Sequence, residues 1–254
     1  MGQTMHRGIA VRVLITFVFA SVANAASINY GNFGPVPPGV SFLGVTESSI
    51  TDAVPLYGPP TPFAIGLDFN PISFGSASTG GPADITEGQL NFTTTTLFGV
   101  GKIKVNEAGD YTLTGAGGPA TAVSAGAIIR ATITQVNGLN IAPISLLPSN
   151  VIFNDAEPPP QTVSPWSIST TLDVAAQMLL NGFSNLDLAT RVDVVINNTL
   201  TSSSEANTAS SIAKKDFTVT VDYVNVLPEP GALALLGAGL GTLAMRRRRS
   251  SKSA

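Results

Sequence analysis

Apolar and polar residues alternate one by one in several separate segments of this chain. The members of the apolar series, of which only Thr170 is polar, are Phe217, Val219, Val221 and Tyr223 in one segment, Val192, Val194 and Ile196 in another, Ile129, Ala131 and Ile133 in a third, Trp166, Ile168, Thr170 and Leu172 in a fourth, and Ile103 and Val105 in a fifth. Because successive side chains of a strand point to opposite faces, a period of two places these residues on one buried face. The pattern therefore predicts half-buried antiparallel strands.

Turn-forming residues separate these segments, as expected for short strands joined by tight connections. They occupy residues 35–39, 58–62, 80–82, 107–110, 115–119, 137–138 and 158–160. Many short strands at this spacing favour an all-β antiparallel sandwich or jelly roll. One helix is expected, at residues 172–183. The proline run at 158–160 could divide two lobes, but strands of the same kind continue on both sides, so we expect one domain.

The first 25 residues have the three-part layout of a secretory signal peptide. Two arginines supply positive charge, and the ten apolar residues 13–22 that follow are too few to span a bilayer permanently. Ala23 and Ala25 are small residues at the positions that a signal peptidase reads, so cleavage is expected before Ala26. The alternatives are an N-terminal membrane anchor or a buried helix.

The C-terminal segment consists of a proline-rich break, an apolar run and a basic block. Pro228, Glu229 and Pro230 interrupt the chain, because proline neither continues a strand ladder nor fits inside a helix. Residues 231–245 carry no charge, and as a helix they would be about 22 Å long, against about 30 Å for a hydrocarbon core. Four arginines that resist translocation come next: Arg246, Arg247, Arg248 and Arg249. The pattern predicts a short transmembrane helix, with the body outside and the arginines inside.

This order of features at the C-terminus resembles the PEP-CTERM sorting signal of exopolysaccharide-producing bacteria, over residues 227–252. The resemblance implies that exosortase, a transpeptidase-like membrane enzyme, recognises the Pro-Glu-Pro motif and cleaves the tail. An ordinary C-terminal membrane anchor is the alternative, and it too would place the body outside the cytoplasm. The predicted division is a signal peptide at 1–25, an all-β passenger domain at 26–226 and a sorting and anchor segment at 227–252.

The predicted passenger domain has few basic residues. The chain has 13 lysines and arginines, of which seven lie in the two end segments, and 16 acidic residues, of which one is in the Pro-Glu-Pro motif. The body therefore has a net charge of about −9. Nucleic-acid binding needs clustered cations that neutralise phosphates. We expect no nucleic-acid partner.

The chain has no cysteine, and its single histidine, His6, lies in the predicted signal peptide. The body therefore has no Ser-His-Asp or Cys-His catalytic unit and no histidine- or cysteine-ligated zinc or haem site. The body could still hold a glycosidase site, since that chemistry uses two carboxyl groups about 5 to 9.5 Å apart. The candidates are Glu47, Asp52, Asp68, Asp84, Glu87, Glu107, Asp110, Asp155 and Glu157. Nothing singles out a pair, so no catalytic residue is assigned, and a carboxylate-dependent hydrolase remains a third hypothesis.

Calcium is the cofactor that best fits this composition, because the body offers hard oxygen ligands. Asn154–Glu157 and Glu107–Asp110 place oxygens on expected turns, but neither matches the alternating pattern of an EF-hand loop. Glu107–Asp110 is more simply a hairpin turn between Val105 and Tyr111. We assign no metal ligand and expect no cofactor, with structural calcium as the alternative.

Two further function hypotheses concern the surface of the domain. The first is a non-catalytic interaction or structural domain of the cell envelope or extracellular matrix, which the family resemblance ties to exopolysaccharide and biofilm production. Its expected partners are exosortase and the membrane during sorting. The second is a carbohydrate-binding module that grips polysaccharide with aromatics and amides on a sheet face. Trp166 discriminates between them: an exposed tryptophan can stack on a sugar, whereas its alternation with Ile168 and Leu172 predicts a core position.

Overall fold

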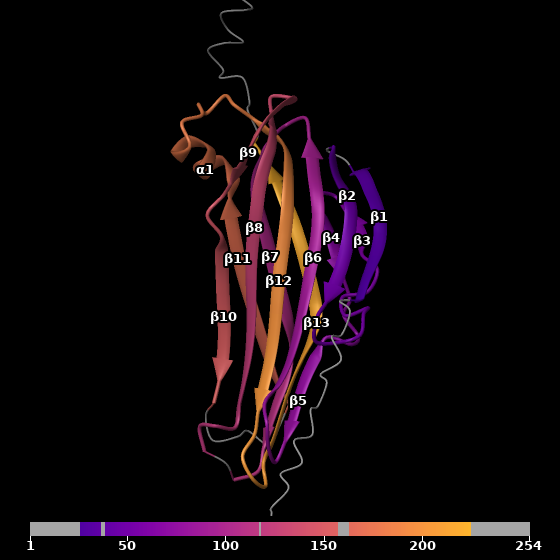
Figure 1. Ribbon diagram of the computed structural model, residues 1–254, viewed down its shortest axis with the longest axis vertical. Coiled ribbons are helices and arrows are strands. Elements are labelled where there is room, and N and C mark those ends of the chain that lie inside the picture. The colour runs from indigo at the N-terminus through magenta and orange to yellow at the C-terminus, as the bar shows by residue number, and fades with distance from the viewer. Residues whose placement is uncertain (1–25, 37–38, 117, 157–162, 225–254) are drawn as a thin grey trace, which may run out of the picture.

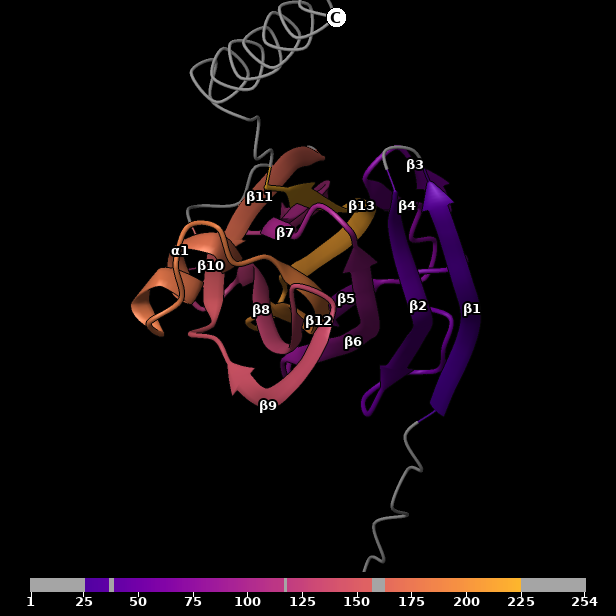
Figure 2. The same ribbon diagram turned by 90° about the horizontal axis from the view of Figure 1, so that it is seen from above.

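Two antiparallel sheets packed face to face form the sandwich-like body of this protein (Figure 1). The structure is a computed structural model, and it describes residues 26–36, 39–116, 118–156 and 163–224. Most strands run along the long axis of the body, and from above they fall into two layers (Figure 2). Within the described ranges the prediction of an antiparallel all-β domain is confirmed.

One layer is a seven-stranded sheet whose neighbouring strands are all antiparallel. In spatial order its strands are β1 (Ala26–Val36), β2 (Val40–Ser49), β6 (Asp84–Thr96), β12 (Ala189–Ser203), β8 (Ala122–Val136) and β10 (Ser149–Asp155), and β9 (Leu139–Ser145) also pairs with β8. Along β6, β12 and β8 buried residues alternate with more exposed ones. The exposed set is rich in Thr, Asn, Gln and Ser, so this sheet presents a polar outer face.

The other layer is a six-stranded sheet that holds three of the five predicted alternating segments. Its strands are β11 (Ser164–Asp173), β7 (Val100–Thr114), β13 (Ala209–Tyr223), β4 (Gly66–Phe69) and β3 (Thr61–Phe63), and β5 (Gly75–Thr79) also pairs with β13. Trp166, Ile168, Thr170 and Leu172 are buried in β11, and Phe217, Val219 and Val221 are buried in β13. Tyr223, at the end of β13, is half-buried.

The predicted helix is present but shorter, as α1 (Val174–Leu180). Asp173 caps its N-terminus by accepting a 2.9 Å hydrogen bond from the Ala176 backbone N–H. Gly182, with a φ of 86°, follows its end in the left-handed region that favours glycine. Leu172 belongs instead to β11, because its side chain is buried in phase with Trp166.

A cluster of aromatic rings fills part of the core between the sheets. The Tyr57 ring lies 5.0 Å from Phe217, 5.1 Å from Phe74 and 6.0 Å from Phe69, each measured between ring centroids and each edge-on. Edge-on contacts place the positive rim of one ring against the negative face of another. Tyr57 comes from the loop between β2 and β3, so a loop residue completes the core.

The prediction of a hairpin turn at Glu107–Asp110 is wrong. These residues lie in the middle of β7, paired with β11 on one side and β13 on the other. Gly109 is required there by close packing: an added Cβ would lie 1.9 Å from the carbonyl oxygen of Ala213 and 2.9 Å from Trp166 Nε1. Glycine here permits a close approach of neighbouring atoms within a strand, which is one of its ordinary roles in sheets.

Other predicted turns have mixed outcomes. Residues 80–82 connect β5 to β6, and Asn137–Gly138 connects β8 to β9 with φ values of 52° and 78°, as in a hairpin turn rich in Asn and Gly. The predicted turn at 58–62 ends earlier than expected, because Thr61 and Pro62 belong to β3. Asn154 and Asp155, expected on a turn, are the last residues of β10.

Several predictions lie outside the described residues: the signal peptide, the Pro-Glu-Pro motif, the apolar run 231–245 and the arginine block. Ala26, the expected first residue after cleavage, begins β1. Within the described ranges, no helix has the length and apolar character needed to cross a membrane.

Candidate functional site

The outer face of the seven-stranded sheet has a hollow of about 310 Å³. Strand register brings Ser48 of β2, Gln89 of β6, Asn197 of β12 and Ile128 of β8 into one row. Asn150 of β10 extends the row to a fifth strand. With neighbouring strands about 4.8 Å apart, the row is about 19 Å long.

A second hollow of about 260 Å³ adjoins the first and shares Ile128, Asn197 and Thr199 with it. It lies over Gly126 of β8, where an added Cβ would meet no atom closer than 3.9 Å. Ile152 of β10 lines it and is 64% exposed. We call the two hollows together the amide groove. Its polar side chains come from Ser48, Glu87, Gln89, Ser124, Arg130, Asn150, Asn197 and Thr199, and the buried Ser49 and Asn198 also line it.

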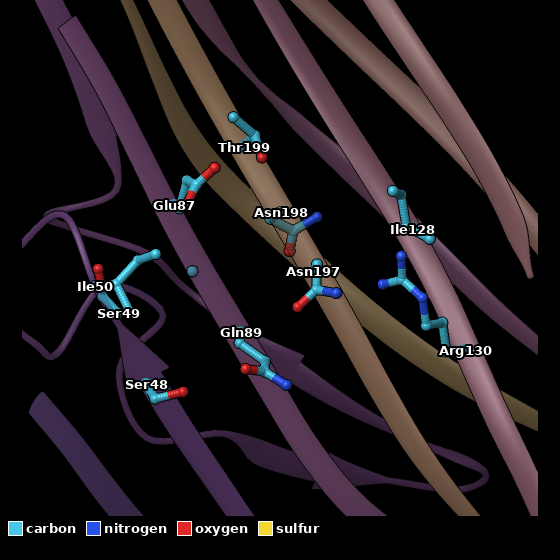
Figure 3. A pocket seen from close by; sticks show the side chains of 11 residues that line it. Ser48, Ser49, Ile50, Glu87, Gln89, Ile128, Arg130, Asn197, Asn198 and Thr199 are labelled. Atoms are coloured by element: carbon cyan, nitrogen blue, oxygen red, sulfur yellow. The ribbon is translucent and has the colours of Figure 1, made fainter. Parts of the chain in front are cut away.

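The amide groove combines hydrogen-bond donors and acceptors at its surface. Figure 3 shows Gln89, Asn197 and Arg130 on three neighbouring strands. The Gln89 side chain donates a 3.0 Å hydrogen bond to Asn91 Oδ1, which orients its amide. Arg130 is exposed and forms no salt bridge with any described residue. Amides offer both donors and acceptors, and a guanidinium offers a planar set of donors, so the groove is suited to a ligand with many hydroxyl groups.

A second polar cluster lies inside the sandwich, around Lys214 of β13 and Glu107 of β7. Lys214 Nζ lies 2.7 Å from Glu107 Oε2, and both side chains are fully buried. The amine is surrounded by aromatic rings: its Nζ lies 4.3 Å from the ring centroid of Phe74, 4.9 Å from that of Phe217 and 5.5 Å from that of Tyr57. Apart from Glu107, the amine is therefore in apolar surroundings.

Asn198 of β12 reaches this pair from the opposite sheet. Its Nδ2 donates a hydrogen bond to Glu107 Oε1, and its Oδ1 accepts a 2.7 Å hydrogen bond from the Tyr57 hydroxyl. One carboxyl group thus contacts the Lys214 amine at one oxygen and the Asn198 amide at the other. Neither Lys214 Nζ nor Glu107 Oε2 makes an aligned hydrogen bond with a described residue, so their contact is a close approach only.

Burial dominates the electrostatics of the cluster. It lowers the pKa of Lys214 and raises the pKa of Glu107, and their mutual attraction opposes both shifts without cancelling either. Both directions favour a neutral amine beside a neutral carboxylic acid. Burial is also the main cause that raises the pKa of Tyr57 well above its ordinary value, so its hydroxyl stays a donor.

Glu47 of β2 is a second buried acid, and it fixes the loop that carries Tyr57. Its Oε1 accepts hydrogen bonds from the backbone N–H groups of Leu56 and Tyr57, the latter at 3.3 Å. Its Oε2 accepts a 2.5 Å hydrogen bond from the Tyr30 hydroxyl. Burial and then this bond raise the pKa of Tyr30.

The other carboxylates named as hydrolase candidates lie nearer the surface. Asp110 pairs with Lys215, Asp155 accepts a hydrogen bond from Tyr111, and Asp84 accepts one from the Ala77 backbone at 2.8 Å. Asp68 lines a shallow depression of about 420 Å³, and Asp52 and Glu87 lie on the surface. Glu157 is outside the described residues. Glu107 is the described carboxylate whose pKa is raised, and it is enclosed in the core rather than open to a cleft.

The loops considered for calcium do not gather ligands in the described part of the chain. Glu107–Asp110 is strand, and Glu107 points into the core. No group of three or more His, Cys, Asp or Glu side chains that could hold a metal ion occurs among the described residues. Among the described residues, the structure therefore shows no site for structural calcium.

Trp166 lies in the core, as its alternation predicts, and is 3% exposed. Its Nε1 donates a 3.1 Å hydrogen bond to the carbonyl of Ala213, and its ring stacks on Phe153 at 6.1 Å. The most exposed described aromatics are Phe63 and Phe98, at 38% and 48%, and neither lines the amide groove. Trp166 therefore offers no stacking platform for a sugar.

Sequence reasoning named Glu47 and Glu107 but not the residues that they contact. The sequence pattern does not single out Lys214, Asn198 or Tyr57. The amide groove was missed as well, because its residues come from strands far apart in the chain.

Comparisons with known proteins identify no family for this chain. No protein-family model matches it, and no curated protein matches its sequence significantly. Among solved structures it is similar to TmCBM61 in complex with β-1,4-galactotriose, with 9% identity over 79% of this chain and 90% of that one, at a TM-score of 0.21. A carbohydrate-binding module of the β-sandwich superfamily matches with 8% identity over 77% and 58% of the two chains, at a TM-score of 0.22.

A third similar structure is the enzymatically active domain of the bacteriophage CBA120 tailspike protein 4. It matches with 14% identity over 78% of this chain and 20% of that one, at a TM-score of 0.18. TM-scores this low carry no argument about this chain.

Proposed function

We propose that this chain is an exported protein of the cell envelope or extracellular matrix, with a non-catalytic, β-rich interaction domain at residues 26–226. The amide groove carries the proposal, because it is an open, polar surface that crosses five strands of one sheet. The buried ionisable pair of the domain lies in the core and not on this surface. Lys214 and Glu107 are fully buried and in contact with each other, so they are shut off from an external substrate.

Sorting through the C-terminal segment is the second part of the proposal. It is supported by the order of the Pro-Glu-Pro motif, the apolar run 231–245 and the arginine block. Exosortase is the proposed processing partner. Before processing, residues 231–245 hold the chain in the inner membrane with the body outside the cytoplasm, because the arginines resist translocation.

Polysaccharide is the candidate ligand of the amide groove, in keeping with the exopolysaccharide setting that the family resemblance implies. The observation that favours it is the row from Ser48 through Gln89 and Asn197 to Asn150, whose hydroxyl and amide groups match the donors and acceptors of sugar hydroxyls. Because Trp166 is in the core, binding would depend on hydrogen bonds rather than on stacking against it.

Affinity electrophoresis of the full chain tests the ligand, with the host's exopolysaccharide cast in the gel. The polysaccharide should retard the wild-type chain, and the double variant Asn197→Ala/Arg130→Ala should lose most of that retardation. Arg191→Ala is the matched control, since Arg191 is an exposed arginine on the same face of β12 as Asn197 but outside the groove. Equal retardation of all three proteins would reject the groove as the site.

Fractionation and intact-mass analysis in the native host test the sorting. The mature chain should end near Leu227 only in cells that contain exosortase, and Glu229→Ala should keep its tail. Full-length chain in the inner membrane with or without the enzyme would reject the sorting proposal. That result would leave the groove hypothesis intact.

A further inference from the structure

We propose that Lys214 and Asn198 become joined by an intramolecular isopeptide bond, and that Glu107 transfers the proton in this reaction. The three side chains meet where β13 and β7 of the six-stranded sheet face β12 of the seven-stranded sheet. The inference concerns the core and does not depend on the proposed function, which concerns the outer surface.

The amine and the amide both contact one carboxyl group. Lys214 Nζ lies 2.7 Å from Glu107 Oε2, and Asn198 Nδ2 donates a hydrogen bond to Glu107 Oε1. All three side chains are held by strands and are 2% exposed or less. A fixed arrangement of this kind removes most of the entropic cost of bringing an amine and an amide together.

The surroundings of Lys214 favour a neutral amine. Lysine is a nucleophile only when it is neutral, and desolvation by an apolar pocket is a recognised way to activate it. Lys214 Nζ lies among the rings of Phe74, Phe217 and Tyr57, and burial lowers its pKa.

The reaction balances without a cofactor or oxidant. Lys214 Nζ attacks the side-chain carbonyl carbon of Asn198 and forms a C–N bond. Glu107 gives a proton to Asn198 Nδ2 through one oxygen and takes one from Lys214 Nζ through the other. The bond from this carbon to Nδ2 then breaks, and ammonia leaves. Burial raises the pKa of Glu107, which suits a group that must both give and take a proton.

Tyr57 supplies the remaining element, a donor at the oxygen where negative charge develops. Its hydroxyl donates a 2.7 Å hydrogen bond to Asn198 Oδ1, and its pKa is raised, so the hydroxyl keeps its proton. A donor already in place in a dry site stabilises the tetrahedral intermediate without reorganisation. Tyr57 is thus a catalytic residue of a single turnover in which the chain is its own substrate.

The bond would tie the two sheets of the sandwich together. Asn198 belongs to the seven-stranded sheet and Lys214 to the six-stranded one, and they flank the connection from β12 to β13. The chain has no cysteine, so disulfides cannot supply such a cross-link. A covalent link of this kind stabilises chiefly by restricting the unfolded chain.

Mass spectrometry of peptides from the denatured full chain provides the test. Glu205 is the one acidic residue between Asn198 and Lys214, so a glutamate-specific protease separates the two residues into different peptides. If the bond exists, the two peptides stay joined, and their combined mass is lower by one ammonia, about 17 Da. Trypsin should also fail to cleave after Lys214. Separate peptides of full mass from the natively folded chain would overturn the proposal.

Substitutions test the role of each residue in forming the isopeptide bond. Lys214→Arg, Asn198→Ala and Glu107→Gln should each give separate peptides, and circular dichroism should show whether each one folds. The neighbours Lys215→Arg and Asn197→Ala are matched controls that should stay cross-linked. For folded, unlinked variants, the midpoint of thermal unfolding should fall by about 6 to 12 °C relative to the linked chain. A fully cross-linked Glu107→Gln variant would reject the role of Glu107, and a cross-linked Lys214→Arg variant would reject the whole assignment.

Discussion

The Tyr57 hydroxyl donates a 2.7 Å hydrogen bond to Asn198 Oδ1 inside the sandwich, across 141 positions of sequence. Tyr57 is placed there by Glu47, which accepts its backbone N–H and that of Leu56. Asn198 in turn donates to Glu107. The two buried acids therefore belong to one connected network that runs from a loop, through the core, to the opposite sheet.

Replacing Tyr57 by Phe removes this hydrogen bond and keeps the aromatic packing. Asn198 Oδ1 then loses its donor in the core, and we expect a loss of about 1–3 kcal/mol in the free energy of unfolding. Urea titration measures it. If the isopeptide bond forms, the same variant should acquire it more slowly. Tyr223→Phe is the control, since Tyr223 is half-buried and away from this network, and should change stability by less than about 0.5 kcal/mol. Equal effects of the two variants would contradict the role given to Tyr57.

Replacing Lys214 by Met leaves Glu107 buried without the polar partner beside its Oε2, and at neutral pH this should cost about 1–3 kcal/mol. Burial holds the pKa of Glu107 above its ordinary value of 4.5, and loss of the lysine removes the attraction that lowers it. The folded state then binds the proton more tightly than the unfolded chain. The contribution of Glu107 is therefore fully present below pH 4.5 and is lost as pH rises through the folded pKa.

Urea unfolding of Lys214→Met from about pH 4 to about pH 8 checks this sign, since the variant should weaken as pH rises. The double variant Lys214→Met/Glu107→Gln is the control, because Gln does not titrate. Glu47 and Tyr57, the other titratable groups nearby, are present in both proteins, so the difference between them isolates Glu107. Parallel pH profiles would show that Glu107 is not the group responsible.

The strand pattern was readable from the sequence because period two is a local property. The alternation of Trp166, Ile168 and Leu172 predicts their burial, and the structure agrees. The same is true of Phe217 and Val219. Which strands pair, and in which register, depends on residues far apart in the chain. The amide groove could not be predicted for that reason, since its row joins five strands.

Lys214 was missed because a bulge reverses the alternation in β13. The phase set by Phe217 and Val219 would turn residue 214 outward. The pairing of β13 with β7 shifts between Lys214 and Asp216, so Lys215 and Asp216 are both exposed and Lys214 faces inward with Ile212. The sequence held one signal of this: Ile212 and Phe217 cannot both be buried without an extra residue between them.

The inward direction of Glu107, unlike that of Lys214, agrees with the alternation in the sequence. Glu107 continues the inward series of Ile103 and Val105, but Gly109 favoured the interpretation as a turn. That glycine is explained by the carbonyl of Ala213, which lies close to it only in the folded state. A long-range steric requirement and a turn preference select the same residue, and local sequence does not separate them.

Replacing Gly109 by Ala tests this explanation. The added Cβ would meet the backbone oxygen of Ala213 at 1.9 Å, and backbone atoms inside a sheet cannot move away cheaply. We expect a loss of about 1–3 kcal/mol from overpacking, measured by urea unfolding. Gly126→Ala is the matched control in β8, because its Cβ would meet nothing closer than 3.9 Å, and it should gain about 0.5–1 kcal/mol. Destabilisation of the control alone would contradict the packing argument.

Trp166 is the only tryptophan of the chain, so tryptophan fluorescence reports on the core and not on the outer surface where the groove lies. At 3% exposure it should be poorly quenched by acrylamide in the folded protein and strongly quenched in urea. It lies in β11 of the six-stranded sheet, whereas the amide groove lies on the outer face of the other sheet. A polysaccharide that retards the protein in a gel should therefore leave the tryptophan emission unchanged. A change in emission on titration, lost in Asn197→Ala/Arg130→Ala, would mean that binding at the groove reorganises the core, contrary to this expectation.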